Sequence, residues 1–123
     1  MNPTGLLTAL SAFLGIWLGH VGVRAIERNS PELWKPALLL ASSGLGLEIL
    51  ALFLPSPFNF ALAILGITLL WDTLELFRQE KRVRKGHAPA NPANPRHARL
   101  LSESPSATTE DLLERSPRQD LFM

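Results

Sequence analysis

The chain has 123 residues, of which 46% are hydrophobic and 19% charged, and its formal net charge is +1. These averages combine two unlike parts, because residues 1–77 are mostly apolar whereas the last third is charged and rich in proline. A soluble domain of this length would interleave polar and apolar positions, and the first part does not. Cysteine is absent, which excludes a disulfide framework and a cysteine-based metal or haem attachment site.

Three apolar blocks of nearly membrane-spanning length follow one another. They cover residues 5–23, 36–54 and 58–77, and the third continues as a charged helix to about residue 85. A helix of about 19 residues extends about 28 Å, close to the roughly 30 Å of a bilayer's hydrocarbon core. Pro36 suits the first turn of the second block, Pro55-Ser56-Pro57 ends it, and Gly86 suits the end of the third helix. The sequence therefore predicts an all-α bundle of three transmembrane helices within residues 1–86.

Lysine and arginine predict the orientation of this bundle, because cytoplasmic loops carry an excess of both. The segment before the first block and the turn between the second and third blocks have neither. The loop after the first block has Arg24, Arg28 and Lys35, and more cations follow the third block. We therefore predict an N-terminus outside and a cytoplasmic C-terminus. Residues expected at the inner interface are Trp17, Trp34, Trp71, Asp72 and Glu75.

Small residues mark the faces through which we expect the helices to pack, because close helix approach in lipid favours them. They form one stripe in each of the first two blocks: Ser11, Gly15 and Gly19, then Ala41, Gly44 and Glu48. A lipid-facing carboxylate at the depth of Glu48 would be costly. We expect Glu48 to meet Ser11, with Asn59 as a further partner. A neutral interhelical Glu48 is favoured over an ion pathway, because no second titratable group lies at its depth.

His20 lies at the inner end of the first block, at the depth of Asp72. One interpretation is an interfacial histidine held by a carboxylate or a carbonyl. The other is a ligand to a haem or a pigment, which makes His20 the candidate cofactor-binding residue. Haem in a bundle usually takes a second axial ligand, and His87 and His97 lie in the tail. The first interpretation is therefore favoured, and the expected ligand is lipid, with no metal centre.

The last third of the chain begins with a basic run and continues as a tail. The run contains Lys81, Arg82, Arg84 and Lys85, which we expect to contact lipid headgroups or a partner. It has no interleaved aromatics for base stacking, so no nucleic acid is expected. Proline beside asparagine or serine recurs in residues 87–123 and favours extended or turn conformations. We predict an extended, mostly irregular tail, basic and then acidic, with a short helix over residues 110–115.

The exit of the third block resembles a family of small bacterial membrane proteins, domain of unknown function 4491. The residues that carry the likeness are Trp71, Glu75, the run Gln79-Glu80-Lys81-Arg82-Val83-Arg84-Lys85-Gly86, Pro89 and Asn91-Pro92, and nearer the start Asn2, Gly5, Leu6, Phe13, Gly19-His20 and Glu27. The chain departs from the family's pattern at Val21, where proline is usual, and at His87-Ala88, where aromatics are usual. The resemblance implies a bacterial inner membrane and three spans. It singles out His20, Glu27, Trp71 and Glu75 for any shared role, and it implies no activity.

No arrangement of catalytic residues can be recognised in the sequence. It contains no nucleophile elbow, no phosphate-binding glycine loop and no His-Glu-x-x-His motif, so we expect no enzyme. The small-residue faces, Glu48 and the long tail favour a non-catalytic accessory subunit of a larger bacterial membrane complex, for example a respiratory or photosynthetic one. Its partners would be the bilayer and other membrane subunits. Two alternatives stay open, a self-assembling channel or transporter component using Glu48, and a pigment- or haem-binding protein using His20.

Overall fold

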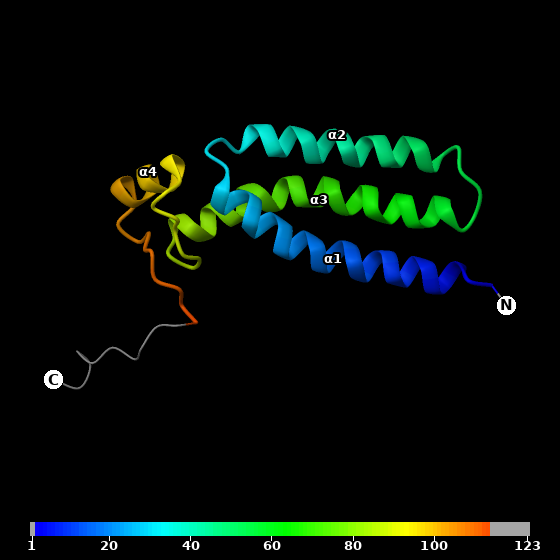
Figure 1. Cartoon of the computed structure of the whole chain (residues 1–123), viewed down its shortest axis with the longest axis horizontal. Coiled ribbons are helices and arrows are strands. Elements are labelled where there is room, and N and C mark those ends of the chain that lie inside the picture. The colour runs from blue at the N-terminus through cyan, green and yellow to red at the C-terminus, as the bar shows by residue number, and fades with distance from the viewer. Residues whose placement is uncertain (1, 114–123) are drawn as a thin grey trace.

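The structure is a computed structural model that describes residues 2–113, and within them every regular element is a helix. The helices are α1 (Thr4–Asn29), α2 (Trp34–Ala51), α3 (Phe58–Arg84) and α4 (Pro95–Glu103) (Figure 1). The all-helical class predicted from the sequence is confirmed for this part of the chain. The third apolar block does continue as one helix into the basic run.

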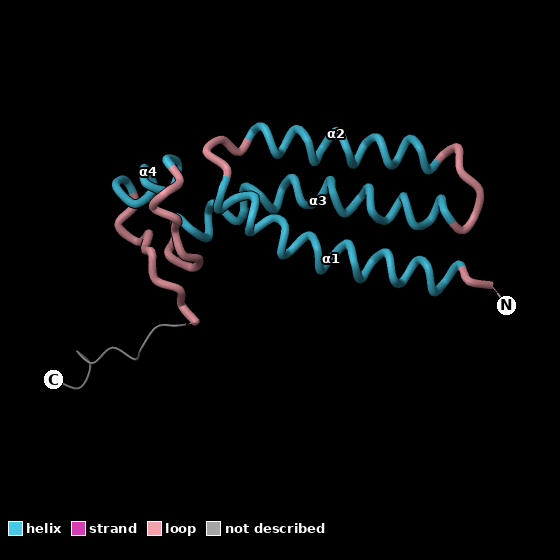
Figure 2. Tube along the Cα trace, in the orientation of Figure 1, coloured by secondary structure: helices cyan, strands magenta, loops and turns pink. Residues whose placement is uncertain are grey.

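The three long helices form a layer in which α3 is central. α1 and α2 each pack along α3, and Figure 1 shows them on opposite sides of it. The N-terminus and the α2–α3 turn lie at one end of the layer, and α4 lies at the other (Figure 2). Because the lysines and arginines of residues 2–113 lie in the C-terminal part of α1, at the start of α2 and from Arg78 onward, we call the α4 end the basic end.

The helix ends follow local chemistry. Pro3 precedes the first turn of α1, and the Asn2 Oδ1 atom accepts a hydrogen bond from the Thr4 amide at 3.0 Å. α3 stops before Gly86, whose φ of +79° is the left-handed conformation that glycine adopts after a helix. The chain can therefore reverse at Gly86 and bring the following residues back against the bundle.

The bundle is apolar on its outside. Large hydrophobic side chains of all three long helices are exposed, and Leu52 and Phe53, just after α2, are 80% and 79% exposed. By length and composition α1 and α3 are able to cross a membrane, which is the case for two of the three predicted spans. α2 has 18 residues and carries Lys35 and Glu48, so by length and composition alone it does not qualify as a membrane-spanning helix.

The segment after α3 is more ordered than the sequence predicted. A nine-residue helix, α4, stands where we expected an irregular tail, and it buries Arg96, His97 and Leu100. Leu100 packs with Val83 of α3 and with Ala90. For the short helix predicted over residues 110–115, residues 110–113 form a bend and a turn instead, and residues 114 and 115 lie outside the described residues.

Candidate functional site at the basic end

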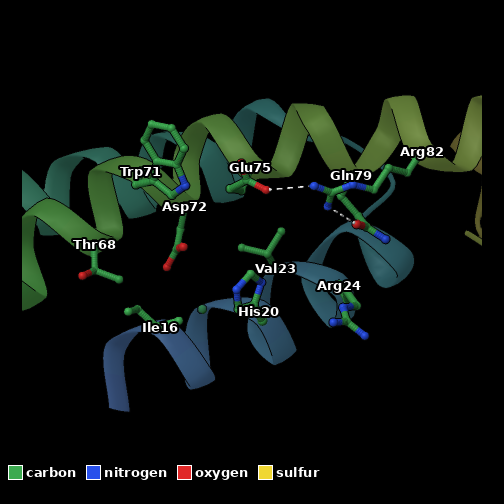
Figure 3. Close-up of a pocket in the computed structure, with 11 residues that line it drawn as sticks. Ile16, His20, Val23, Arg24, Thr68, Trp71, Asp72, Glu75, Gln79 and Arg82 are labelled. Carbon is green, nitrogen blue, oxygen red and sulfur yellow. Dashed lines mark hydrogen bonds and ion pairs between the residues drawn. The ribbon is translucent and has the colours of Figure 1, made fainter. Parts of the chain in front are cut away.

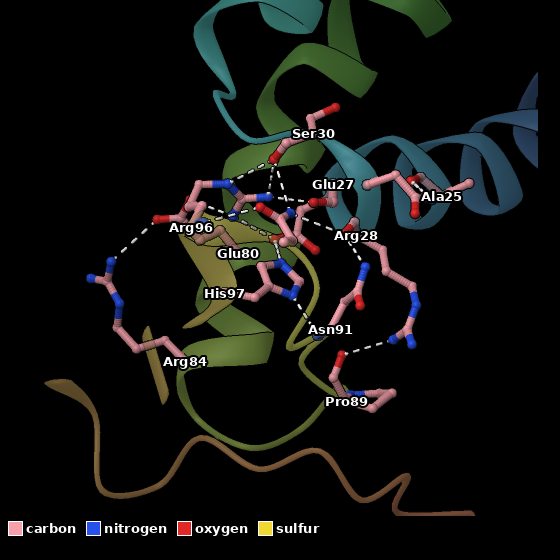
Figure 4. Close-up of polar contacts among 12 residues, drawn as sticks. Ala25, Glu27, Arg28, Ser30, Glu80, Arg84, Pro89, Asn91, Arg96 and His97 are labelled. Carbon is pink, nitrogen blue, oxygen red and sulfur yellow. Dashed lines mark hydrogen bonds and ion pairs between the residues drawn. The ribbon is translucent and has the colours of Figure 1, made fainter. Parts of the chain in front are cut away.

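A buried polar cluster joins α4 to the ends of α1 and α3, and we call it the junction (Figure 4). Its centre is Glu27, in the last turns of α1, which is 1% exposed. The Glu27 Oε1 atom lies 2.7 Å from Arg96 Nη1 and 2.7 Å from His97 Nε2. The same Arg96 nitrogen lies 2.8 Å from Oε2 of Glu80 on α3. The guanidinium therefore bridges two carboxylates that come from different helices.

The hydrogen bonds of His97 fix its tautomer. Nδ1 accepts the backbone N–H of Asn91 at 2.8 Å, so this ring nitrogen carries no proton. Nε2 then carries the proton and donates to the Glu27 carboxylate at 2.7 Å. The imidazole is neutral, fully buried and bonded at both nitrogens. It is consequently not open to a metal or a haem iron.

The junction also supplies donors to the C-terminal end of α1. The last carbonyls of a helix lack intrahelical partners. Arg96 donates to the carbonyls of Glu27 and Ser30, and Asn94 Nδ2 donates to those of Arg28 and Ser30, each at 3.0 Å. Asn91 Nδ2 reaches the Arg28 carbonyl at 3.1 Å. A cation at this end of a helix is also favoured by the helix dipole.

Asn94 explains why α4 begins where it does. Its Oδ1 atom accepts the amide of Arg96 at 3.0 Å and caps the helix, and Pro95 occupies the first turn. This helix start places Arg96 and His97 on the face toward α1. Residues 87–103 thus form a defined cap on the bundle, and we use that name below.

A cavity of about 150 Å³ lies between α1 and α3 beside the junction (Figure 3). His20 of α1 and Asp72 of α3 both line it. The Asp72 carboxylate lies against the backbone of Gly19, where an added Cβ would be 2.8 Å from Oδ1. His20 makes no hydrogen bond or ion pair with any described residue, and its nearest charged partner is the Asp72 carboxylate, with which it interacts electrostatically.

Charged and aromatic groups of α3 continue this wall toward the basic end. Glu75 lies 3.0 Å from Arg78 and 3.4 Å from Arg82, and Arg78 stacks over Trp71 at 4.9 Å from the ring centroid. Trp17 and Trp34 are exposed, at 56% and 60%. Of the basic run, Arg84 pairs with Glu80 at 3.2 Å, and Lys81 and Lys85 are exposed.

The small-residue stripes both face α3. Ser11 and Gly15 are buried, and a Cβ on Gly15 would lie 3.3 Å from Thr68 of α3. A Cβ on Gly44 would lie 2.8 Å from the carbonyl oxygen of Gly66, so α2 and α3 approach at their backbones there. Ala41 is half-buried on the same helix.

The expected contact between Glu48 and Ser11 is not formed. Glu48 lies against Gly66 of α3, where an added Cβ would be 2.7 Å from Oε1. Ser11 belongs to α1, which packs on α3 separately. Asn59, the other expected partner, bonds the amide of Phe60 at 2.9 Å. Glu48 Oε1 is buried and has no hydrogen-bond partner among the described residues.

Sequence reasoning did not find Asn94, Arg96 or His97. The family resemblance singles out Glu27 and includes Glu80 only as one member of the run after Glu75. A signal did exist, because Asn94-Pro95 is a helix-start pattern and Arg96, His97 and Leu100 follow at helical spacing. Among the described residues, no group of three or more His, Cys, Asp and Glu side chains is placed to hold a metal.

Comparisons with known proteins give one result. Neither the curated proteins nor the solved structures contain a match. A family model matches residues 2–94, which is most of the chain and includes Glu27, Glu80 and Asn94. The chain therefore belongs to the family described as Domain of unknown function (DUF4491).

Proposed function

We propose that the chain is a three-span protein of the bacterial inner membrane, with the N-terminus outside and the cap in the cytoplasm. The exposed apolar surface of α1, α2 and α3 supports this, because patches of that extent are covered by lipid or protein. α2 lies alongside α3, and Leu52 to Leu54 extend its apolar length. A third crossing would also put all loop cations on one side, as the positive-inside rule requires.

We further propose that the protein is a non-catalytic accessory subunit of a larger membrane complex, and that the cap presents a fixed surface to a partner. The junction is the observation that carries this proposal. A tail that served only as a tether would not need a carboxylate, a guanidinium and an imidazole removed from water to hold it. Holding α4 in one position is useful when something must recognise it.

An apolar groove on the layer supports the same function. It has a volume of about 280 Å³ and runs between α1 and α2 over α3. One wall carries the glycines of α1, including Gly19 and Gly22, and the other carries Leu40 and Leu47. Nothing would meet a Cβ on Gly22 within 4 Å, so this wall is open to the close approach of a partner helix.

The two alternatives are less well supported. A pore through Glu48 would need this carboxylate to face an axis of an oligomer, yet it packs on Gly66 inside the α2–α3 contact. Ligation by His20 would need a second axial ligand on the usual pattern. His97 is bonded at both nitrogens and is not available for that role.

The test is native electrophoresis of mild-detergent extracts from the host membrane, with mass spectrometry of the band that contains the chain. We expect a hetero-complex of defined mass that persists with Arg99→Met and dissociates with Arg96→Met. Both residues are on α4, and only Arg96 is in the junction. A chain that migrates alone, or as a symmetric oligomer of itself, would contradict the accessory-subunit proposal.

A further inference from the structure

A wide groove extends from the His20 cavity toward the cap. It has a volume of about 570 Å³ and lies between the ends of α1 and α3, closed at its far end by residues 87–89 and 111–113. One wall is a ladder on α1, His20, Arg24 and Arg28, which recur every four residues and so share one helix face. Gln79 and Arg82 of α3 form the opposite wall.

The cations of this groove are not balanced by its carboxylates. Arg24 makes no hydrogen bond or ion pair with any residue from 2 to 113. Arg28 makes one long hydrogen bond, 3.4 Å, to the carbonyl of Pro89. Glu27 is already bonded to Arg96 and His97.

The remaining acids nearby lie toward the two ends of the groove. Glu75, in the adjoining cavity, bonds Arg78 and Arg82. Asp111, at the far end of the groove, accepts the amide of Leu113 at 3.0 Å. Asp72 lies in the same cavity as Glu75, against Gly19 and close enough to His20 for an electrostatic interaction. The middle of the groove therefore presents uncompensated positive charge.

Apolar side chains adjoin this charge on the side toward the middle of the bundle. His20, Arg24, Gln79 and Arg82 line both the groove and the smaller cavity, and that cavity continues past them to Ile16, Val23 and Trp71. A ligand that fits both parts has an anionic end and an apolar end. Arginine forks bind phosphate oxygens in two-point geometry, which suits the anionic end.

We infer that the groove binds the phosphate headgroup of an anionic membrane lipid, held by Arg24 and Arg28, with the lipid's apolar part along Ile16 and Trp71. The inference rests on the proposed placement of the basic end at the cytoplasmic face of a membrane. It differs from general attraction to a charged surface, because two arginines on one helix face contribute the site, whereas the exposed Lys81 and Lys85 do not.

The experiment uses the full chain in detergent, native mass spectrometry and two probes, phosphatidylglycerol and phosphatidylcholine. We expect phosphatidylglycerol to bind and to be retained at least about tenfold better, since each basic residue near an anionic lipid contributes about fivefold. Arg24→Gln with Arg28→Gln should remove most of this preference. The matched control, Lys35→Gln with Arg99→Gln, removes the same charge at exposed positions outside the groove and should leave the preference within about twofold.

Other outcomes decide the inference as well. Equal losses in both double variants would overturn it, because binding would then follow total charge. Loss of phosphatidylglycerol to millimolar inorganic phosphate would show a free-phosphate site and would also overturn it. Flotation of the wild-type chain with neutral phosphatidylcholine vesicles tests membrane placement separately. A chain that floats yet shows no preference for phosphatidylglycerol would contradict only the lipid site.

Discussion

The bundle and the cap are stabilised in opposite ways. In the bundle most large apolar side chains are outside. Its buried positions are mostly small or polar, among them Ser11, Gly15, Gly44, Gly66 and Asp72, apart from a small apolar cluster of Val23, Ala37 and Leu76. The cap has the arrangement of a soluble domain, with apolar side chains inside. Its Ala90 and Leu100 form a buried apolar cluster with Val83 of α3, and its buried charge, Arg96, is paired.

On the proposed placement of the bundle in a membrane, this contrast follows from the solvent that each part faces. Lipid gives no reason to bury leucine, so helices in a bilayer associate through close backbone contact at small residues. In water the burial of leucine is favourable, and an unpaired buried charge is costly. Along α3, the change from packing at small residues to burial of large apolar side chains occurs between Gly66 and Val83, which is where the membrane boundary is expected.

The largest effect is expected from breaking the junction. Arg96→Met leaves Glu27 buried without its cation, and removal of one partner of a buried ion pair costs about 3–5 kcal/mol. Amides of α4 should then lose their protection from hydrogen exchange while those of α1 keep it. Arg99→Met on the exposed side of α4 is the control, and an equal loss of protection there would contradict the role of the junction.

A smaller effect is expected from separating α2 from α3. A Cβ at position 44 would lie 2.8 Å from the Gly66 carbonyl oxygen and 2.9 Å from Leu70 Cγ, so Gly44→Ala must push two helices apart. Overpacking of this kind costs about 1–3 kcal/mol. Gly46→Ala meets nothing within 4 Å and should be neutral. Melting temperatures in detergent compare the two, and a lower value for Gly46→Ala would refute the backbone contact.

Gly19→Ala should cost less than Gly44→Ala, because the atoms in its way are side-chain oxygens of Asp72 that are able to move. Gly22→Ala, which meets nothing within 4 Å, is its control on the same helix. The combination of Gly19→Ala with Asp72→Ala should restore the melting temperature of Asp72→Ala alone. Simple additivity of the two losses would mean that Gly19 and Asp72 do not interact.

The smallest effect is expected at Glu48. Its Oε1 atom has no hydrogen-bond partner among the described residues, so Glu48→Gln removes no bond there and keeps the shape of the side chain. We expect a change in stability of less than about 0.5 kcal/mol. Detergent extracts of the two chains should show equal helix content and equal melting. A chain that fails to fold with glutamine would show that an ionised Glu48 is required.

Much of the bundle could be predicted from the sequence and little of the cap. Helix positions follow from apolar block length and from Pro36 and Gly86, because backbone groups in lipid must be satisfied within a helix. The sequence does not show which helix each small-residue stripe faces. Ser11 and Glu48 lie at compatible depths, and yet α1 and α2 both pack on α3. Order along the chain does not reveal which helix is central.

The junction could not be predicted from local sequence patterns, for a different reason. Glu27 and Arg96 are 69 positions apart, and nothing near either residue indicates the other. A helix as short as α4 is not stable by itself and depends on tertiary contacts, so its proline-rich surroundings suggested an irregular tail. The Asn94-Pro95 pattern does indicate a helix start. The reversal of the chain at Gly86 then brings that helix against the bundle, where tertiary contacts stabilise it.

We propose that the cap sits on the cytoplasmic face of a three-span bundle, and cysteine labelling in cells tests this placement most directly. The chain has no cysteine, so Ser56→Cys in the α2–α3 turn and Ser102→Cys on α4 each introduce a single exposed target. A membrane-impermeant maleimide should label Ser56→Cys in cells whose outer membrane alone is permeabilised, and Ser102→Cys only after the inner membrane is opened as well. Labelling of Ser102→Cys before the inner membrane is opened, or of both positions from one side, would contradict the account.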